Sequence, residues 1–186
     1  MWTLGPTWRD EAALSRAWRT AEPFPHLVID DFVAHGPLME LLDEEGVERQ
    51  EGDIFAFEAS RDLDELSAAF GAALCGPLAR ITGKPIARAA LRAYAYRPGH
   101  YLLPHTDHQD GRPRLVAFAY YLPTPEPPRG GELELFCVSP DRVDSAVVIA
   151  PVPWRLALFD CSDVSVHQVR EVLAGLRLSL AGWFYP

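Results

Sequence analysis

The sequence predicts a mainly β fold with supporting helices, built as an antiparallel sandwich or jelly roll. Seventeen prolines and thirteen glycines among 186 residues indicate many turns, which suits short strands better than a helix bundle. Helical spacing of apolar residues lies mostly within residues 1–82, whereas residues from about 86 to 186 form short apolar or alternating runs between turn residues. A chain of this length supports one hydrophobic core, so we expect a single domain over residues 1–186.

Apolar spacing predicts three helices, over residues 7–20, 37–45 and 63–81. The first has Thr7 as its N-cap, and the third ends at Gly83, a residue type that commonly follows a helix end. The proline-bounded apolar run over residues 24–32 predicts a strand between the first two helices.

The second half of the chain predicts strands. Six runs have the required length and pattern: residues 87–96, 115–122, 132–137, 146–150, 155–159 and 177–185. The proline-rich stretch 124–131 interrupts this series and predicts a loop, because proline resists both helix and central strand.

Charge and cysteine content narrow the function classes. The net charge of -9 disfavours binding to phosphate backbones, so we expect no nucleic-acid partner. The local basic group Arg112, Arg114 and Arg129 is either charge on the substrate side or solvated surface. Three cysteines without a CxxC pair, no visible signal peptide and no long apolar run predict a cytoplasmic protein that does not enter a membrane.

Two side chains that can bind a metal lie two residues apart, at His105 and Asp107. Residues at this spacing in an extended chain point to the same side, so an imidazole and a carboxylate can aim at one point. His167, flanked by apolar residues after a predicted strand, is the best candidate for a third ligand. Two histidines and one carboxylate form the facial triad of non-haem iron(II) oxygenases, which leaves the opposite face of the metal open.

Arg177 opens the last predicted strand, ten residues after His167, and Ser179 follows on the same face. A guanidinium with a hydroxyl beside it can bind a carboxylate, and a buried Arg needs such a partner. A dicarboxylic 2-oxo acid satisfies both ends, because its 2-oxo acid group chelates iron and its distal carboxylate meets Arg177. Each residue also has a plain structural interpretation: a hydrogen-bonded pair at a strand end, a core histidine and a surface salt bridge.

Five stretches carry a family resemblance, in family order and over nearly the whole chain: residues 24–32, 101–107, 120–123 with 130–133, 165–169 and 177–184. They resemble the prolyl-hydroxylase-like branch of the 2-oxoglutarate oxygenases, and within it the catalytic domain of the ribosomal-protein prolyl hydroxylases. The resemblance implies a double-stranded β-helix, a distorted jelly roll.

The resemblance also implies roles for single residues. His105, Asp107 and His167 would hold iron(II), and Arg177 would bind the distal carboxylate of 2-oxoglutarate. Two tyrosines, Tyr96 and Tyr121, would contact the same cosubstrate, and Ser179 would add a hydrogen bond. Asp107 is retained where related halogenases have Gly or Ala, so hydroxylation is expected rather than halogenation.

The expected reaction is the hydroxylation of an unactivated C–H bond with iron(II), 2-oxoglutarate and O₂. The leading substrate is proline, a prolyl residue or another amino-acid-like molecule, taken either free or in a peptide. We expect the substrate to meet segments 50–60, 108–114 and 124–129. One alternative is a tailoring oxygenase for a free or carrier-bound natural product. An alternative of another class is a non-catalytic, cupin-like module that binds a metal or a sugar. Oligomeric state is left open.

Overall fold

The computed structural model of the chain describes residues 2–30, 32–35, 47–109, 111 and 113–186. The predicted helix over residues 37–45 lies outside them. The described helices are a 3₁₀ turn η1 at Pro6–Arg9, α1 at Glu11–Thr20 and α2 at Asp64–Thr82. The described strands are β1 Thr3–Leu4, β2 His26–Ile29, β3 Val33–His35, β4 Val47–Gly52, β5 Phe55–Ser60, β6 Arg88–Tyr96, β7 Tyr101–His105, β8 Val116–Leu122, β9 Arg129–Gly130, β10 Leu133–Ser139, β11 Arg142–Ile149, β12 Leu156–Asp160, β13 His167–Val169, β14 Val172–Ala174 and β15 Arg177–Tyr185.

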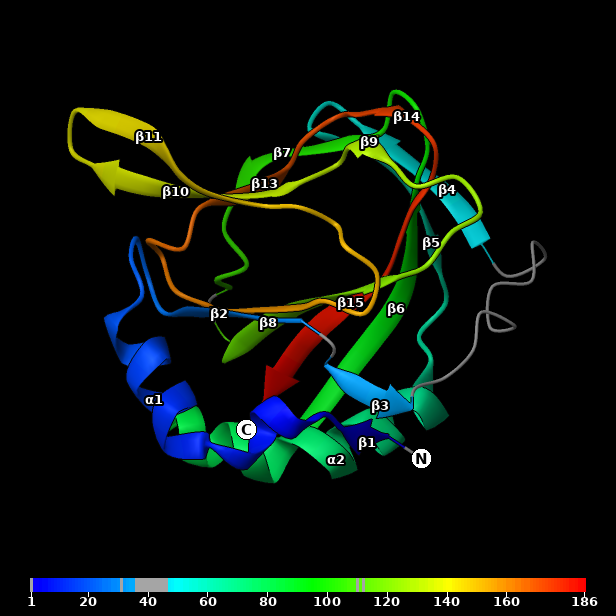
Figure 1. Cartoon of the computed structure of the whole chain (residues 1–186). Coiled ribbons are helices and arrows are strands. Elements are labelled where there is room, and N and C mark those ends of the chain that lie inside the picture. The colour runs from blue at the N-terminus through cyan, green and yellow to red at the C-terminus, as the bar shows by residue number, and fades with distance from the viewer. Residues whose placement is uncertain (1, 31, 36–46, 110, 112) are drawn as a thin grey trace.

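Eleven of the described strands form one antiparallel sheet, in the order β11-β10-β13-β7-β5-β6-β15-β8-β12-β2 with β4 paired to β5. The sheet folds over on itself, so that β7, β10 and β13 form one layer above β6, β15, β8 and β2 (Figure 1). β5 joins the layers because it pairs with both β6 and β7. The predicted mainly β fold with supporting helices is confirmed.

Both helices cover the outer face of the lower layer (Figure 1). The period of two along β15 explains how one strand serves both faces: Leu178, Leu180 and Phe184 pack into the core cluster that α2 supplies with Phe70 and Leu74. The alternate residues of β15 therefore face the space between the two layers.

The helices agree with the sequence except at the start of the first one. Instead of one helix over residues 7–20, η1 is followed by α1, whose N-cap is Asp10 and not Thr7. The Asp10 carboxylate accepts a hydrogen bond from the Ala13 N–H at 2.9 Å, which satisfies an otherwise free donor of the first turn. α2 ends at Gly83 in the left-handed conformation, with φ of 73°, as predicted.

The strand predictions missed the short and the charged strands. Of the predicted strand over residues 24–32, only β2 (His26–Ile29) pairs in the large sheet. β11 begins at Arg142, earlier than the strand predicted over residues 146–150. The hairpin β4–β5 and the short strands β13 and β14 were not predicted, and β9 lies within the predicted loop 124–131. Strands of two or three residues are too short to show a period of two.

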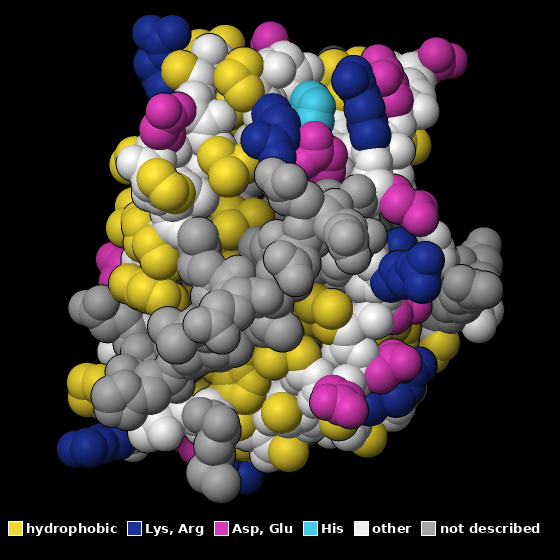
Figure 2. Space-filling model, turned by 90° about the vertical axis from the view of Figure 1, so that its right-hand side faces the viewer, with side chains coloured by type: hydrophobic (Ala, Val, Ile, Leu, Met, Phe, Trp, Pro, Cys, Tyr) yellow, Lys and Arg dark blue, Asp and Glu magenta, His cyan; other side chains and the backbone are white. Residues whose placement is uncertain are grey.

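Surface charge on the described residues is mixed in sign. On the face shown in Figure 2, hydrophobic side chains are most frequent at the left and at the bottom, and Lys or Arg side chains lie next to Asp or Glu at the top and right. Absence of nucleic-acid binding stays a prediction. Within the described part of the chain, no helix combines the length and the apolar character that crossing a membrane would require.

A buried carboxylate fixes β13 against β10. Glu134 is only 3% exposed and accepts hydrogen bonds from Arg170 Nε and Nη2, both at 2.7 Å, and from Gln168 Nε2 at 2.6 Å. Hydrogen bonding to Arg170 lowers the pKa of Glu134 from its ordinary 4.5 to about 2. The two cross-strand partners of Glu134 thus hold a strand of only three residues, β13, in place.

Glu134→Gln should lower the free energy of unfolding at pH 7 by about 2 kcal/mol, because it removes a charge-assisted, two-point contact. The folded-state pKa is depressed, so the stabilisation is complete above pH 4.5 and is lost as the pH falls toward 2. Denaturant titrations of both proteins across this range should show their difference shrinking. Glu48→Gln, at an exposed position on β4, is the control; an equal loss there, or a difference that does not depend on pH, would contradict the role of Glu134.

Candidate active site

Two histidines meet across paired strands of the upper layer. His105 ends β7, His167 begins β13, and the two residues are opposite each other in the antiparallel pair. Their ring centroids lie 4.3 Å apart. Residues 62 positions apart in the sequence therefore present their imidazoles to one point.

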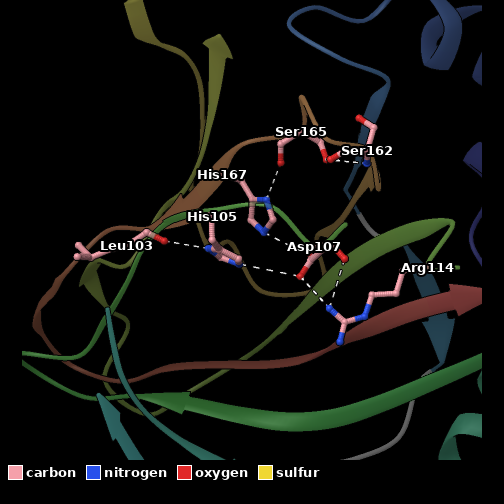
Figure 3. A network of polar contacts seen from close by, with 7 residues as sticks. All are labelled: Leu103, His105, Asp107, Arg114, Ser162, Ser165 and His167. Carbon is pink, nitrogen blue, oxygen red and sulfur yellow. Dashed lines mark hydrogen bonds and ion pairs between the residues drawn. The ribbon is translucent and has the colours of Figure 1, made fainter. Parts of the chain in front are cut away.

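Asp107 completes the group from outside the strand. β7 ends at His105, so the carboxylate comes from the loop that follows and not from a shared strand face as predicted. Asp107 Oδ2 lies 3.5 Å from His167 Nε2, and Oδ1 lies 4.0 Å from His105 Nε2. One ligand atom of each residue lies within 4.8 Å of the others, and all three side chains point inward (Figure 3).

Hydrogen bonds to the main chain determine which ring nitrogens face the centre. His105 Nδ1 lies 2.9 Å from Leu103 O, and His167 Nδ1 lies 3.0 Å from Ser165 O. A carbonyl oxygen only accepts, so each Nδ1 donates its hydrogen, and Nε2 is the ring nitrogen left on the side of Asp107 to bind a metal. Burial lowers the pKa of His167 to about 4, which keeps that imidazole neutral.

The donor set fits a divalent transition metal. Two imidazole nitrogens and a carboxylate converge, and in the described residues no cation lies between them other than Arg114 at the side of Asp107. Such a group is electrostatically unfavourable until a cation enters it. Two nitrogens and one oxygen on one side of an ion suit iron(II) and leave the other side open. Main-chain carbonyls that hold the outer ring nitrogens are typical of metal-binding histidines.

Arg114, which the sequence offered only as charge on the substrate side or as solvated surface, contacts a metal-binding residue. Its Nη1 donates to Asp107 Oδ1 and to the Asp107 main-chain oxygen, both at 3.4 Å, and its guanidinium stacks 3.7 Å over the Trp183 ring. The side chain is only 15% exposed. The alternative of a solvated surface charge is therefore wrong for Arg114, which orients the carboxylate of a loop residue (Figure 3).

A pocket of about 220 Å³ lies beside the three residues, between the two layers of the sheet. Its walls are mostly apolar and aromatic, and the residues that line it are Phe55, Phe57, Tyr94, Tyr96, Leu102, His105, Asp107, Ala117, Phe118, Ala119, Leu133, Phe159, His167, Val169, Arg177, Ser179, Ala181, Gly182 and Trp183. The only ionisable acids and bases among them, tyrosines apart, are His105, Asp107, His167 and Arg177. A pocket of this kind binds a small organic group and excludes water around a few charges.

Arg177 is a buried cation that lacks a carboxylate partner among the described residues. It is 3% exposed, and its Nε has no hydrogen-bond partner. Its closest polar neighbour is Ser179 Oγ, 3.4 Å from Nη1. An unpaired buried charge is costly, so this arrangement favours an anionic ligand in the pocket.

The two predicted tyrosines flank this cation. The guanidinium carbon of Arg177 lies 4.6 Å from the ring centre of Tyr96 and 5.1 Å from that of Tyr121. Burial raises the pKa of Tyr96, so its hydroxyl stays protonated and can donate. The hydroxyl of Tyr121 is buried without a partner and can do the same. The structure thus brings together Tyr96, Tyr121, Arg177 and Ser179, as the sequence predicted.

The predicted substrate-facing segments differ in their positions. Segment 50–60 belongs to the β4–β5 hairpin, and Phe55 and Phe57 on it line the pocket. Segment 108–114 contributes Arg114 at the edge of the site. The proline-rich segment 124–129 contributes no residue to the pocket lining. The sequence predicted segment 50–60 as substrate-facing but did not identify Phe55 and Phe57 in it, whose signal is a short apolar Phe-Ala-Phe run.

A comparison with protein families matches residues 91–185, slightly more than half of the chain, to the 2OG-Fe(II) oxygenase superfamily. Among curated proteins, prolyl 3-hydroxylase OGFOD1 of Xenopus laevis is 31% identical over 180 residues, which cover 88% of this chain and 35% of that protein. The Mus musculus protein of the same name is 30% identical over 183 residues, covering 88% and 33%. The chain thus spans about a third of the length of these relatives.

Solved structures share the fold. A prolyl 4-hydroxylase of Pseudomonas putida superposes with a TM-score of 0.70 at 22% identity, over 94% of this chain and 98% of that one. A prolyl hydroxylase of Trichoplax adhaerens, in complex with a hypoxia inducible factor peptide fragment, gives 0.67 at 16% identity, over 96% and 90%. The likeness confirms the predicted double-stranded β-helix.

Arg114→Lys should weaken metal binding about tenfold, because outer partners of ligating carboxylates contribute at this scale. The charge is kept, so the loss would come from the planar group that stacks on Trp183 and reaches Asp107. Calorimetric titration with iron(II) without oxygen measures the change. Arg142→Lys, on the exposed β10–β11 hairpin, is the control. Equal metal affinity in both variants would rule out an orienting role for Arg114.

Proposed function

The chain belongs to the 2OG-Fe(II) oxygenase superfamily, and from this premise we propose that it is a dioxygenase that hydroxylates a prolyl residue of a peptide. The observation that carries the proposal is the pairing of two opposite features in one apolar pocket. One feature is the metal-binding group of His105, Asp107 and His167, and the other is the unpaired cation Arg177. All four residues line the same pocket.

We propose that His105, Asp107 and His167 hold the iron(II). Their donor set fits that ion, and their outer atoms are already engaged by Leu103 O, Ser165 O and Arg114. Members of this superfamily use iron(II), 2-oxoglutarate and O₂, the cofactors predicted from the sequence. Bound iron(II) supplies the activation of O₂ that the attack on an unactivated C–H bond requires.

Arg177 would bind the distal carboxylate of 2-oxoglutarate. The guanidinium has free donors, the Ser179 hydroxyl is beside it, and the Tyr96 and Tyr121 rings restrict its movement. Charge-assisted hydrogen bonds in a water-poor pocket are strong and directional. The carboxylate would thereby offset the charge that Arg177 carries in the core, and the 2-oxo acid end would be directed toward the triad.

The neutral aromatic walls support a prolyl residue as the substrate. Once the triad and Arg177 are engaged, no charge remains in the lining to pair with the ammonium and carboxylate of a free amino acid. Phe55, Phe57 and Trp183 offer ring faces against which a pyrrolidine ring can pack. Relatives and structural neighbours named prolyl hydroxylases point the same way. A free or carrier-bound small molecule is the alternative that the assay below tests.

We further propose that residues 1–186 form one catalytic domain and that it acts in the cytoplasm. β2 and β5, from the first third of the chain, pair within the same sheet as the strands of the second half. Cys75, Cys137 and Cys161 are all free, which suits a reducing compartment.

Arg177→Gln should raise the dissociation constant for 2-oxoglutarate about 100-fold, because a buried charge pair is lost. Metal affinity should stay within about twofold, since Arg177 contacts none of the three metal-binding residues. Anaerobic titrations, followed by the visible band of the iron–2-oxoglutarate complex, separate the two constants. Arg92→Gln is the control, because its guanidinium already pairs with Asp62 and it does not line the pocket. An unchanged constant for 2-oxoglutarate would reject the role of Arg177.

The protein with iron(II), 2-oxoglutarate and O₂ should release succinate and add one oxygen atom to proline-containing peptides. Mass spectrometry of the peptide and measurement of succinate check this together. Asp107→Ala should abolish both signals. Turnover of free proline or of carrier-bound small molecules, without turnover of any peptide, would favour the tailoring alternative. Binding of metal without any turnover across the panel would count against the proposal.

A further inference from the structure

In the upper layer of the sheet, two paired segments of the chain run from the metal-binding group toward Arg177. Leu135 pairs with His167, and Leu133 pairs with Val169. Farther along, the Gly131 N–H donates to Glu171 O at 3.2 Å. β9 and β14 continue this pairing side by side (Figure 1). Gly131 thus lies at the end of the ladder that is farther from the triad.

Gly131 contacts the Arg177 side chain so closely that a methyl group has no room. A Cβ added to Gly131 would lie 2.9 Å from Arg177 Cδ and 2.8 Å from Val172 Cγ2. Both distances are well inside the optimal separation of about 3.5–4.0 Å between carbon atoms. Gly131 also has φ of 73°, a conformation that L side chains rarely adopt. The absence of a side chain here therefore decides where the Arg177 side chain can lie.

Of the two crowded neighbours, Arg177 is the one that can move. Val172 is fully buried, its N–H donates to His100 O at 3.0 Å, and its carbonyl accepts from the Gly99 N–H at 2.8 Å. The Arg177 guanidinium meets two tyrosine rings and one hydroxyl at 3.4 Å, and among the described residues no ion pair holds it in place. A methyl group on Gly131 would displace Arg177 away from the far end of the ladder, toward the triad.

We propose that Gly131 and Val172 set the length of the dicarboxylate that the pocket accepts, by fixing how far the Arg177 guanidinium stands from the metal-binding group. This proposal rests on the proposed function, in which the triad and Arg177 bind opposite ends of the 2-oxo diacid. Gly131 lies against both the Arg177 side chain and Val172, and neither Gly131 nor Val172 lines the pocket, so they act as positioning residues. Relief of the clash would move the Arg177 guanidinium by up to about one bond length. This displacement is comparable with the change in ligand length when one methylene is added or removed.

The test compares three 2-oxo diacids that differ by one methylene: oxaloacetate, 2-oxoglutarate and 2-oxoadipate. Calorimetry with the iron(II)-loaded protein under anaerobic conditions gives each dissociation constant without turnover. In Gly131→Ala, the affinity for oxaloacetate relative to 2-oxoglutarate should rise about tenfold, the scale of one methylene in a pocket. In Val172→Ala, which opens space beside Gly131 and lets it recede from Arg177, the preference should shift the other way, toward 2-oxoadipate.

Gly83→Ala is the matched control, because Gly83 has the same φ of 73° and its added Cβ meets nothing within 4 Å. It should leave the order of the three diacids unchanged. Equal weakening of all three ligands in Gly131→Ala, or no change, would overturn the proposal. If Gly131→Ala does not fold, as judged by circular dichroism, Val172→Ala decides alone, and an unchanged ratio overturns it. A wild-type protein that binds metal but none of the diacids would instead refute the proposed function.

Discussion

The antiparallel pairing of β7 with β13 is the constraint on which the site depends. It places His105 opposite His167, and it does so with strands of five and three residues. Short strands hold a register weakly by themselves, so neighbouring contacts must supply the rest. Glu134 does this from β10, and the main-chain carbonyls of Leu103 in β7 and of Ser165 just before β13 fix the two rings. The geometry of the metal-binding group is thus set by the sheet and not by the group itself.

Charge is distributed in the pocket so that a ligand completes it. Asp107 faces two imidazoles, and Arg177 is buried beside two tyrosine rings without a counterion among the described residues. Each end is unfavourable when alone, because apolar walls raise the cost of an isolated charge. A metal at one end and a carboxylate at the other would remove both costs. Arg177 is unpaired among the described residues and Asp107 has only Arg114 at its side, so both ends of the pocket favour binding of an oppositely charged ligand.

The outer face of the same strands serves stability. Along β15, residues of one parity face the pocket, and residues of the other pack on α2, so the strand cannot slip by one residue without exposing core side chains. This coupling keeps Arg177, Ser179 and Trp183 in a fixed order along the pocket. A helix-covered sheet thereby provides a rigid support for a site whose ligands come partly from loops.

The sequence by itself determined the fold class, the three metal-binding candidates and the Arg177–Ser179 pair, because these follow from periodicity, side-chain chemistry and family resemblance. It also located α2 and its end at Gly83 correctly. Tertiary structure alone decided that Asp107 lies beyond the strand, that Arg114 orients it and that Gly131 borders Arg177. These contacts join residues with no spacing rule between them. The short strands β13 and β14 were missed for a related reason, since they exist only through pairing with distant partners.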